Sequence, residues 1–169
     1  HNSSRFKNDY AFAAINNDGS VITWGDSLNG QNISAVNDSL TNVKTIRSSS
    51  TAFAVIREDG SVVAWGNPEG GGDLSEASSA LDGSINVVEI YSTKMSFAAL
   101  RSDGSVITWG KSSSGGNSNE VTQRLDGTND VVSIVSNMSS YAALHVDGSV
   151  TTWGYSTSGG DQSEVSDEL

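Results

Sequence analysis

The chain has 169 residues, of which 36% are hydrophobic and 17% are charged, and its formal net charge is −11. An acidic surface repels a phosphate backbone, so we expect no nucleic-acid partner. The chain has no Cys and only two His, which excludes disulfide and thiolate chemistry and disfavours a zinc site. No apolar run is long enough to cross a bilayer, so we expect no membrane span.

One eight-residue motif occurs four times. It reads DGSVITWG at 18–25, DGSVVAWG at 59–66, DGSVITWG at 103–110 and DGSVTTWG at 147–154. Successive copies are 41, 44 and 44 residues apart, and the difference falls in one short connection, which follows Leu40, Leu81 and Leu125. A period of this length indicates stacked structural units, and we place them at 1–40, 41–81, 82–125 and 126–169.

Each unit predicts three strands in a fixed order. Leading strands are indicated by a Val followed three residues later by an Ile, beginning at Val43, Val87 and Val131. Second strands begin with an aromatic residue and cover 12–15, 53–56, 97–100 and 141–144. Third strands have the pattern Ser-Val-x-x-Trp, as from Ser20 to Trp24. Asp-Gly between two apolar runs predicts a hairpin, for which we expect a two-residue type I′ turn.

The second strands are apolar on both faces, and small Ala residues occur on both. A strand of this kind needs cover on both sides, and small side chains let a neighbouring layer approach closely. The pattern therefore favours sheets packed between similar sheets, as in propeller blades or stacked solenoid turns.

A polar segment follows a glycine-bearing loop in each unit and carries two apolar residues four positions apart. The pairs are Val36/Leu40, Ala77/Leu81, Val121/Leu125 and Val165/Leu169. Because a spacing of four is helical, we expect one short helix of about two turns per unit. Asp73, Ser75, Asp161 and Ser163 are candidate N-caps.

The succession of Ala-Ala-Leu, Asp-Gly-x-Val-x-x-Trp-Gly and a glycine-bearing loop resembles the regulator of chromosome condensation repeat family. The first unit carries the resemblance furthest, from Asp18 to Gly25 and on to Asn29-Gly30-Gln31. The resemblance implies propeller blades, and in the best-known members it implies nucleotide exchange on a nuclear GTPase and chromatin binding. No functional residue of those members is matched here. The Ser-, Asn- and Gly-rich style is similar to tandem arrays in large bacterial surface or secreted proteins.

Tryptophan is the natural candidate for ligand binding because its ring stacks on sugars and cations. The candidates are Trp24, Trp65, Trp109 and Trp153, together with Tyr155 in a variable loop. The alternative is that the four Trp are packing residues of the repeat. The residues directly after Trp-Gly differ between units (Asp26, Asn67, Lys111 and Tyr155), which makes them better candidates for specificity.

We expect no cofactor, with calcium as the alternative. Loop carboxylates Asp73, Glu76, Asp161 and Glu164 could coordinate it through oxygen. No catalytic constellation is apparent: His1 is terminal, and His145 occupies a position held elsewhere by Asn or Arg, so we expect it to be solvent exposed. The four motif Asp are explained as turn residues rather than as metal ligands.

The two ends of the chain differ from the inner repeats. The first unit has Asn2 and Arg5 where later units have the Val and Ile of the leading strand, and the chain stops at Leu169, where a further leading strand would begin. Two interpretations remain open. Either the chain is a fragment of a longer array, or its N-terminal segment completes the last unit and closes a ring. We also expect that copies of the chain can associate with one another through the ends of the repeat array.

We therefore expect a single all-β repeat domain over 1–169. It has four units of about 44 residues, each a three-stranded antiparallel sheet plus a short helix. We favour propeller-like blades, with an open or spiral solenoid stack as the alternative. The expected function is non-enzymatic: an adhesion or spacer scaffold, or a protein-interaction surface, in a larger extracellular or cell-surface bacterial protein. The alternatives are a carbohydrate-binding module and, more weakly supported, an exchange-factor-like partner of a GTPase.

Overall fold

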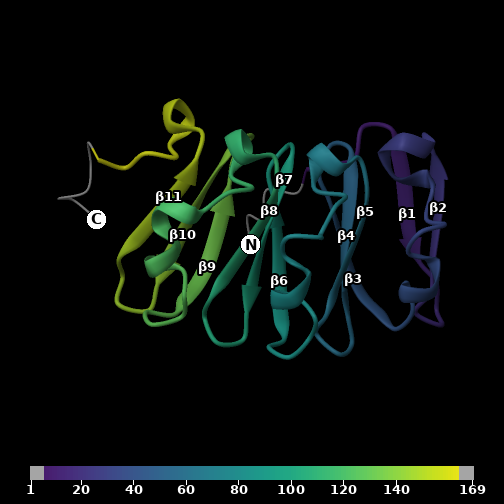
Figure 1. Ribbon diagram of the computed structural model, residues 1–169, viewed down its shortest axis with the longest axis horizontal. Helices are drawn as coiled ribbons and strands as arrows, with labels where there is room; N and C mark the ends of the chain where they lie inside the picture. The colour runs from purple at the N-terminus through teal and green to yellow at the C-terminus, as the bar shows by residue number, and fades with distance from the viewer. Residues whose placement is uncertain (1–5, 164–169) are drawn as a thin grey trace.

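The chain folds into four antiparallel β-sheets that lie side by side in sequence order (Figure 1), as seen in a computed structural model that describes residues 6–163. The first sheet contains β1 (Ala11–Ile15) and β2 (Val21–Gly25). The second contains β3 (Val43–Ser48), β4 (Ala52–Arg57) and β5 (Val62–Gly66), and the third β6 (Val87–Ser92), β7 (Ser96–Arg101) and β8 (Val106–Gly110). The fourth contains β9 (Val131–Ser136), β10 (Ser140–His145) and β11 (Val150–Gly154). The second strand of each unit is central in the three complete sheets.

The first sheet departs from the three-stranded plan, since it has only β1 and β2 among the described residues. This agrees with the missing apolar pattern in its leading segment. The described part of that segment contacts the second unit, where Ser48 donates its hydroxyl to the carbonyl of Phe6 and Asp9 donates its N–H to the carbonyl of Ser50. The first and last sheets lie at opposite ends of the row (Figure 1), so the described residues do not close a ring.

The hairpin turns contain glycine as expected, but they are not the type I′ turns that we expected. Gly19, Gly60, Gly104 and Gly148 have φ between 75° and 88°, whereas the preceding Asp residues do not have positive φ. In the first turn, Gly19 and Ser20 both pair with Asn16, which makes a three-residue loop ending in a left-handed glycine. The carboxylate of Asp18 accepts hydrogen bonds from the N–H and hydroxyl of Ser20, so Asp and Ser stabilise this wider turn together.

The expected two-turn helices are short 3-10 turns instead: η2 (Asn37–Ser39), η4 (Ser78–Ala80) and η6 (Asn119–Arg124). Their hydrogen bonds close over three residues, as from the N–H of Ser39 to Val36. Segments this short and rich in Ser and Asn do not nucleate an α-helix. The apolar spacing nevertheless reports packing, because Leu40, Leu81 and Leu125 are buried at the sheet junctions. The fourth pair, Val165/Leu169, lies outside the described residues.

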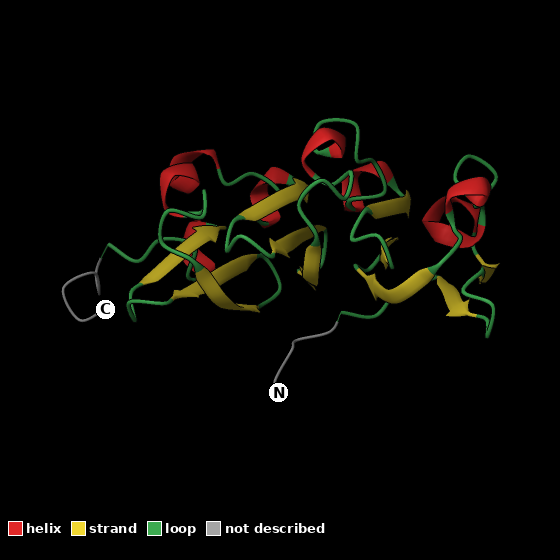
Figure 2. Cartoon of the chain, turned by 90° about the horizontal axis from the view of Figure 1, so that it is seen from below, coloured by secondary structure: helices red, strands yellow, loops and turns green. Residues whose placement is uncertain are grey.

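A second set of helical turns follows Trp-Gly in each unit and was not expected from the sequence. The set consists of η1 (Ser27–Gln31), η3 (Pro68–Gly70), η5 (Ser112–Ser114) and η7 (Ser156–Ser158). Asp26 and Asn67 accept backbone N–H groups at the start of η1 and η3, so these two loop residues have a local structural role. Both sets of turns lie along one side of the row of sheets (Figure 2).

The hydrophobic core is divided into three clusters, each formed between one sheet and the next. Between the second and third sheets, one face of β4 and β5 packs on the opposite face of the following sheet, as Ala54 and Ile56 do on Phe97 and Trp109. The other two clusters repeat this arrangement. An inner sheet is thus covered on both sides, as the apolar pattern of the second strands indicated.

A loop glycine completes each junction between neighbouring sheets. The indole N–H groups of Trp65, Trp109 and Trp153 donate hydrogen bonds of 2.8, 2.9 and 3.1 Å to the carbonyls of Gly30, Gly71 and Gly115 of the preceding unit. A Cβ on these glycines would lie 2.5–2.7 Å from the ring of Phe53, Phe97 or Tyr141. We call this contact the Trp–Gly junction. It requires glycine for both conformation and space.

The Trp–Gly junction predicts that identical substitutions at two equivalent glycines have different costs. Gly115 and Gly159 share a φ of 88°, but a Cβ at Gly115 meets Tyr141 while a Cβ at Gly159 meets nothing within 4 Å. Gly159→Ala should cost only the left-handed strain of about 1–2 kcal/mol. Gly115→Ala should cost a further 1–3 kcal/mol or so from overpacking. Urea unfolding of both variants measures the difference, and equal costs would contradict the junction.

Candidate functional site

The structure separates the candidate ligand-binding aromatics into two groups. Trp65, Trp109 and Trp153 are buried, and each ring is stacked on the aromatic residue opposite it at centroid distances of 5.1–5.3 Å. Neither ring face nor the indole N–H is available to a sugar, so these three are packing residues of the Trp–Gly junctions. Trp24 and Tyr155 are each 50% exposed.

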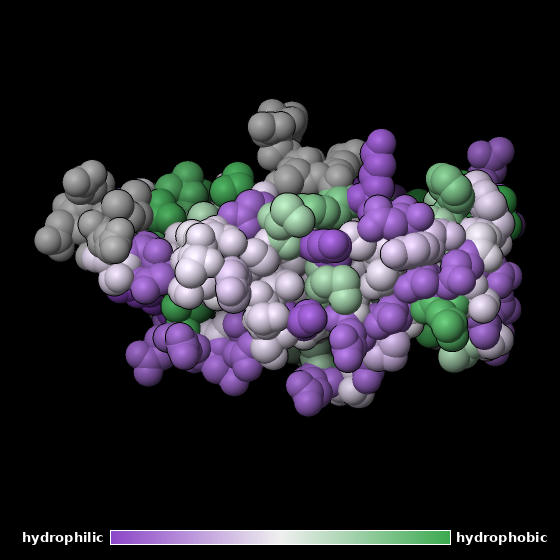
Figure 3. Space-filling view, turned by 90° about the horizontal axis from the view of Figure 1, so that it is seen from above, coloured by the Kyte–Doolittle hydropathy of each residue, from purple (hydrophilic) through white to green (hydrophobic). Residues whose placement is uncertain are grey.

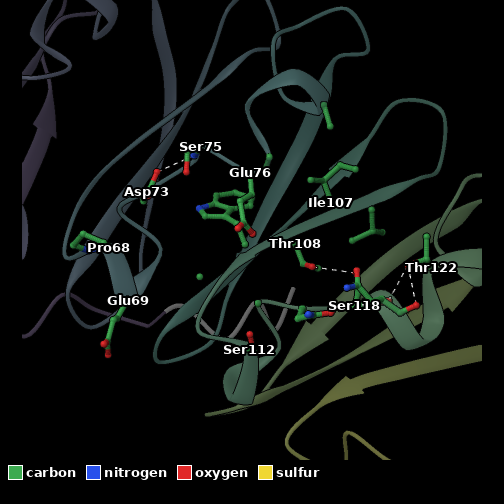
Figure 4. A pocket seen from close by; sticks show the side chains of 18 residues that line it. Pro68, Glu69, Asp73, Ser75, Glu76, Ile107, Thr108, Ser112, Ser118 and Thr122 are labelled. Atoms are coloured by element: carbon green, nitrogen blue, oxygen red, sulfur yellow. Dashed lines mark hydrogen bonds between the residues drawn. The ribbon is translucent and has the colours of Figure 1, made fainter.

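The described residues contain a groove of about 630 Å³ between the loop that follows Trp-Gly in the second unit and, in the third unit, strand β8 with the loop after it. Figure 4 shows Asp73 and Ser75 on one side, and Thr108, Ser118 and Thr122 on the other. Hydrogen bonds fix both walls: Asp73 accepts the N–H of Ser75, and Thr108 and Ser118 share a bond of 3.1 Å between their hydroxyls. The volume lies within the range of ligand-binding pockets.

All charged side chains that line the groove are acidic. Glu69, Asp73 and Glu76 contribute carboxylates to its lining, all three residues are exposed, and no Lys, Arg or His lines it. Its remaining side chains are mostly Ser, Thr, Asn and Ala. The groove therefore offers a negative, hydrogen-bonding surface that complements a positively charged group. We call Glu69, Asp73 and Glu76 the acidic rim.

The candidate calcium ligands are not gathered into one site. Asp73 and Glu76 belong to the second unit and Asp161 to the fourth, while Glu164 lies outside the described residues. Asp161, like Asp73, accepts the backbone N–H of the residue two positions later, at 2.9 Å from Ser163. Within residues 6–163, His, Asp and Glu form no group of three or more that could hold a metal ion.

The expectation that His145 is exposed was wrong. Its ring is 3% exposed and lies 2.8 Å from both the carbonyl of Asn129 and the hydroxyl of Thr151. Because a carbonyl can only accept, Nδ1 carries the proton. Arg57 and Arg101 hold the same position in the preceding units and also donate to carbonyls of the connection before their sheet. The side chain at this position therefore has a structural role in the three complete units.

The four motif aspartates are likewise engaged within their own turns. At Asp147, the hydroxyl and then the N–H of Ser149 lower the pKa of the carboxyl to about 2. The same pair of bonds is present at Asp18, Asp59 and Asp103. These carboxylates stabilise turns, as the sequence indicated, and they are not grouped for catalysis.

Comparison with solved structures identifies the fold as propeller-like. The structure of Kap60 bound to yeast RCC1 (Prp20) matches at a TM-score of 0.61 and 17% identity, covering 87% of this chain and 42% of that chain. Prp20p from Saccharomyces cerevisiae matches at 0.60 and 16%, covering 87% and 44%. The ectodomain of the Physcomitrella patens receptor kinase CR4 matches at 0.56 and 15%, covering 88% and 38%.

These matches make the chain an all-β repeat protein with propeller-like blades, in agreement with the fold expected from its repeats. The chain spans about two fifths of the length of these three structures. No family model matches the sequence, and no curated protein matches it. No helix within residues 6–163 has the length and apolar character needed to cross a bilayer.

The loss of stability on replacing a tryptophan should depend strongly on its position in the row of sheets. Trp109→Phe removes the partner of a buried carbonyl and shrinks a buried ring, so it should lower the free energy of unfolding by about 2–4 kcal/mol. Trp24→Phe should change it by less than about 0.5 kcal/mol, because no preceding unit covers Trp24. Urea unfolding compares them, and a large cost at Trp24 would contradict the assignment.

Because of Tyr141, we expect the folded protein to lose stability at alkaline pH. Burial raises the pKa of its phenol well above the ordinary value, even though the hydroxyl contacts Thr93 and Ser96. The folded state therefore holds the proton more tightly than the unfolded state, and stability should fall as the pH rises through about 10. Tyr141→Phe should remove much of this fall in urea midpoints between neutral and alkaline pH. Tyr155→Phe, at an exposed tyrosine, should not.

Proposed function

We propose that the chain is a non-catalytic, protein-binding scaffold module. The main observation behind this proposal is that the repeated residues and the residues that differ between units have different roles. The repeated Asp, Gly and Trp maintain turns and sheet junctions. The acidic residues of the groove, in contrast, all belong to the loop after Trp-Gly of the second unit, which differs from the loops of the other units, and the repeated strand β8 forms part of the opposite wall. Variable loops on a rigid repeat frame are typical of binding surfaces.

The partner that fits the groove is a cationic segment of another protein. The acidic rim and the net charge of −11 attract positive charge over a distance, and the Ser, Thr and Asn side chains can bind an extended backbone. The engaged states of His145 and the motif aspartates support a role without catalysis.

The setting we propose is a larger extracellular or cell-surface bacterial protein, in which the module serves adhesion or spacing. Support comes from the sequence: the chain is free of Cys, poor in Lys, rich in Ser, Asn and Gly, and modular in its repetition. Its surface fits an aqueous setting, since hydrophilic and intermediate side chains cover most of the face in Figure 3 and hydrophobic ones form small separate patches.

A carbohydrate-binding function is a second candidate only through Trp24 and Tyr155. The exposed stack of Phe12 on Trp24, with ring centroids 5.3 Å apart, is the observation that favours it. A GTPase partner is the weaker alternative. The Prp20p structure is described together with binding to Gsp1p and histones, and the likeness to this chain is one of fold.

The acidic rim provides the test of the proposed function. An array of extended peptides of varied charge should show binding that is strongest for Lys- and Arg-rich sequences and that falls with added salt. The triple variant Glu69→Gln, Asp73→Asn and Glu76→Gln should lose at least about tenfold in affinity. A control variant with Asp38→Asn, Glu58→Gln and Asp130→Asn removes equal charge at exposed residues outside the groove and should retain most of the binding.

Three outcomes would contradict the proposed function. Equal losses in the two triple variants would show that net charge, and not the groove, attracts the peptides. Binding to a glycan array that is abolished by Trp24→Ala, without peptide binding, would favour the carbohydrate alternative. Substrate turnover that disappears on changing one loop would contradict a non-catalytic role.

A further inference from the structure

The two ends of the row are complementary halves of the same junction. The first sheet presents Phe12 and Trp24, which are 62% and 50% exposed, whereas their equivalents in the later sheets are at most 4% exposed. Within the described residues, the indole N–H of Trp24 has no acceptor, although the three other indoles each donate to a glycine carbonyl. This end therefore presents the aromatic part of a junction, although its sheet has no leading strand among the described residues.

The last sheet presents the other half. Gly159 is equivalent to Gly30, Gly71 and Gly115, but nothing lies within 4 Å of the position of its Cβ, and its carbonyl has no donor among the described residues. Leu144 is 42% exposed, whereas Ile56 and Leu100 at the equivalent positions are 2% and 7% exposed. Within the described residues, this end presents the glycine and the apolar side chain of a junction without a following unit.

A ladder of backbone hydrogen bonds is open at the same two ends. Equivalent residues pair from unit to unit: Asp9 donates to Ser50, Ser50 to Lys94 and Lys94 to Met138. In the described chain, the N–H of Met138 and the carbonyl of Asp9 are the unused ends of this ladder. A sheet that met the last sheet in the internal geometry would pair them.

We propose that a second copy of this chain docks head to tail, with its first sheet against the last sheet of the first copy. Phe12 of one copy then packs on Gly159 of the other, the indole of Trp24 donates to the Gly159 carbonyl, and Leu144 is covered. The contact uses the aromatic, glycine and backbone-ladder parts of the three internal junctions, without the leading-strand Val and Ile that those junctions also contain. This inference goes beyond the proposed function and is independent of the acidic groove.

Such an interface is heterologous, because the two surfaces that meet are different. Each bound copy leaves one free surface of each kind, so association continues until a ring closes or the copies form an open row. Copies with a net charge of −11 repel one another, and raised salt should therefore strengthen association by screening that repulsion.

The test uses one variant for each surface. Trp24→Ala damages the first sheet's face and Leu144→Asp damages the last sheet's face, and both positions lie outside the internal junctions. In sedimentation and light scattering at raised salt, the average mass of the unmodified chain should rise with concentration to at least twice that of one chain. Each variant alone should associate at least about tenfold more weakly.

Mixing the two variants gives the decisive result. One intact surface of each kind remains in the mixture, so a one-to-one mixture should form a heterodimer of twice the single-chain mass and grow no further. Tyr155→Ala and Val132→Asp are the matched controls, with exposures of 50% and 52%, and should associate like the unmodified chain. Cooperative thermal unfolding of every variant checks that it is folded.

Three results would overturn the proposal. The first is an unmodified chain that stays at single-chain mass, which would leave flanking units of a longer chain as the occupants of the two faces. The second is a variant mixture that does not associate. The third is association of the two variants to the same extent as the controls, which would place self-association on another surface.

Discussion

The structure depends on one repeated contact between neighbouring sheets: an indole that donates to the carbonyl of a glycine whose missing side chain makes room for the next aromatic ring. A sheet of two or three short strands cannot bury its apolar faces alone. The Trp–Gly junction gives each sheet a neighbour at a fixed distance and orientation. The hydrophobic clusters, the backbone ladder and the order of the sheets all follow from repeating it.

The same contact explains why a residue that is repeated in every unit need not belong to a binding site. Trp109 and Gly71 recur because every junction needs both, and Asp103 recurs because its carboxylate stabilises a turn. Most residues that differ between units lie in the loops after Trp-Gly, and two of these loops, together with β8, line the acidic groove. The frame is thus rigid and repetitive, while the surface that it presents changes from unit to unit.

The sequence predicted the strands, their order and the stacked sheets, because apolar alternation, Asp-Gly and small residues on both strand faces act locally. Prediction from the sequence failed for features that depend on contacts between units. Four-residue spacing at Val121 and Leu125 predicted a helix, but the spacing reflects burial of Leu125 in a junction by a 3-10 turn. His145 was expected to be exposed because its position varies, yet it is buried against Asn129. The groove could not have been predicted, since it lies between loops of two different units.

The central claim is that stability resides in the junctions between sheets rather than within the sheets. Amide hydrogen exchange tests it most directly, because the four β-hairpins share nearly one sequence but differ in their cover. Amides that pair β4 with β5 and β7 with β8, which have neighbours on both sides, should exchange at least about tenfold more slowly than those that pair β1 with β2. Equal protection of the first and the inner hairpins would contradict the claim.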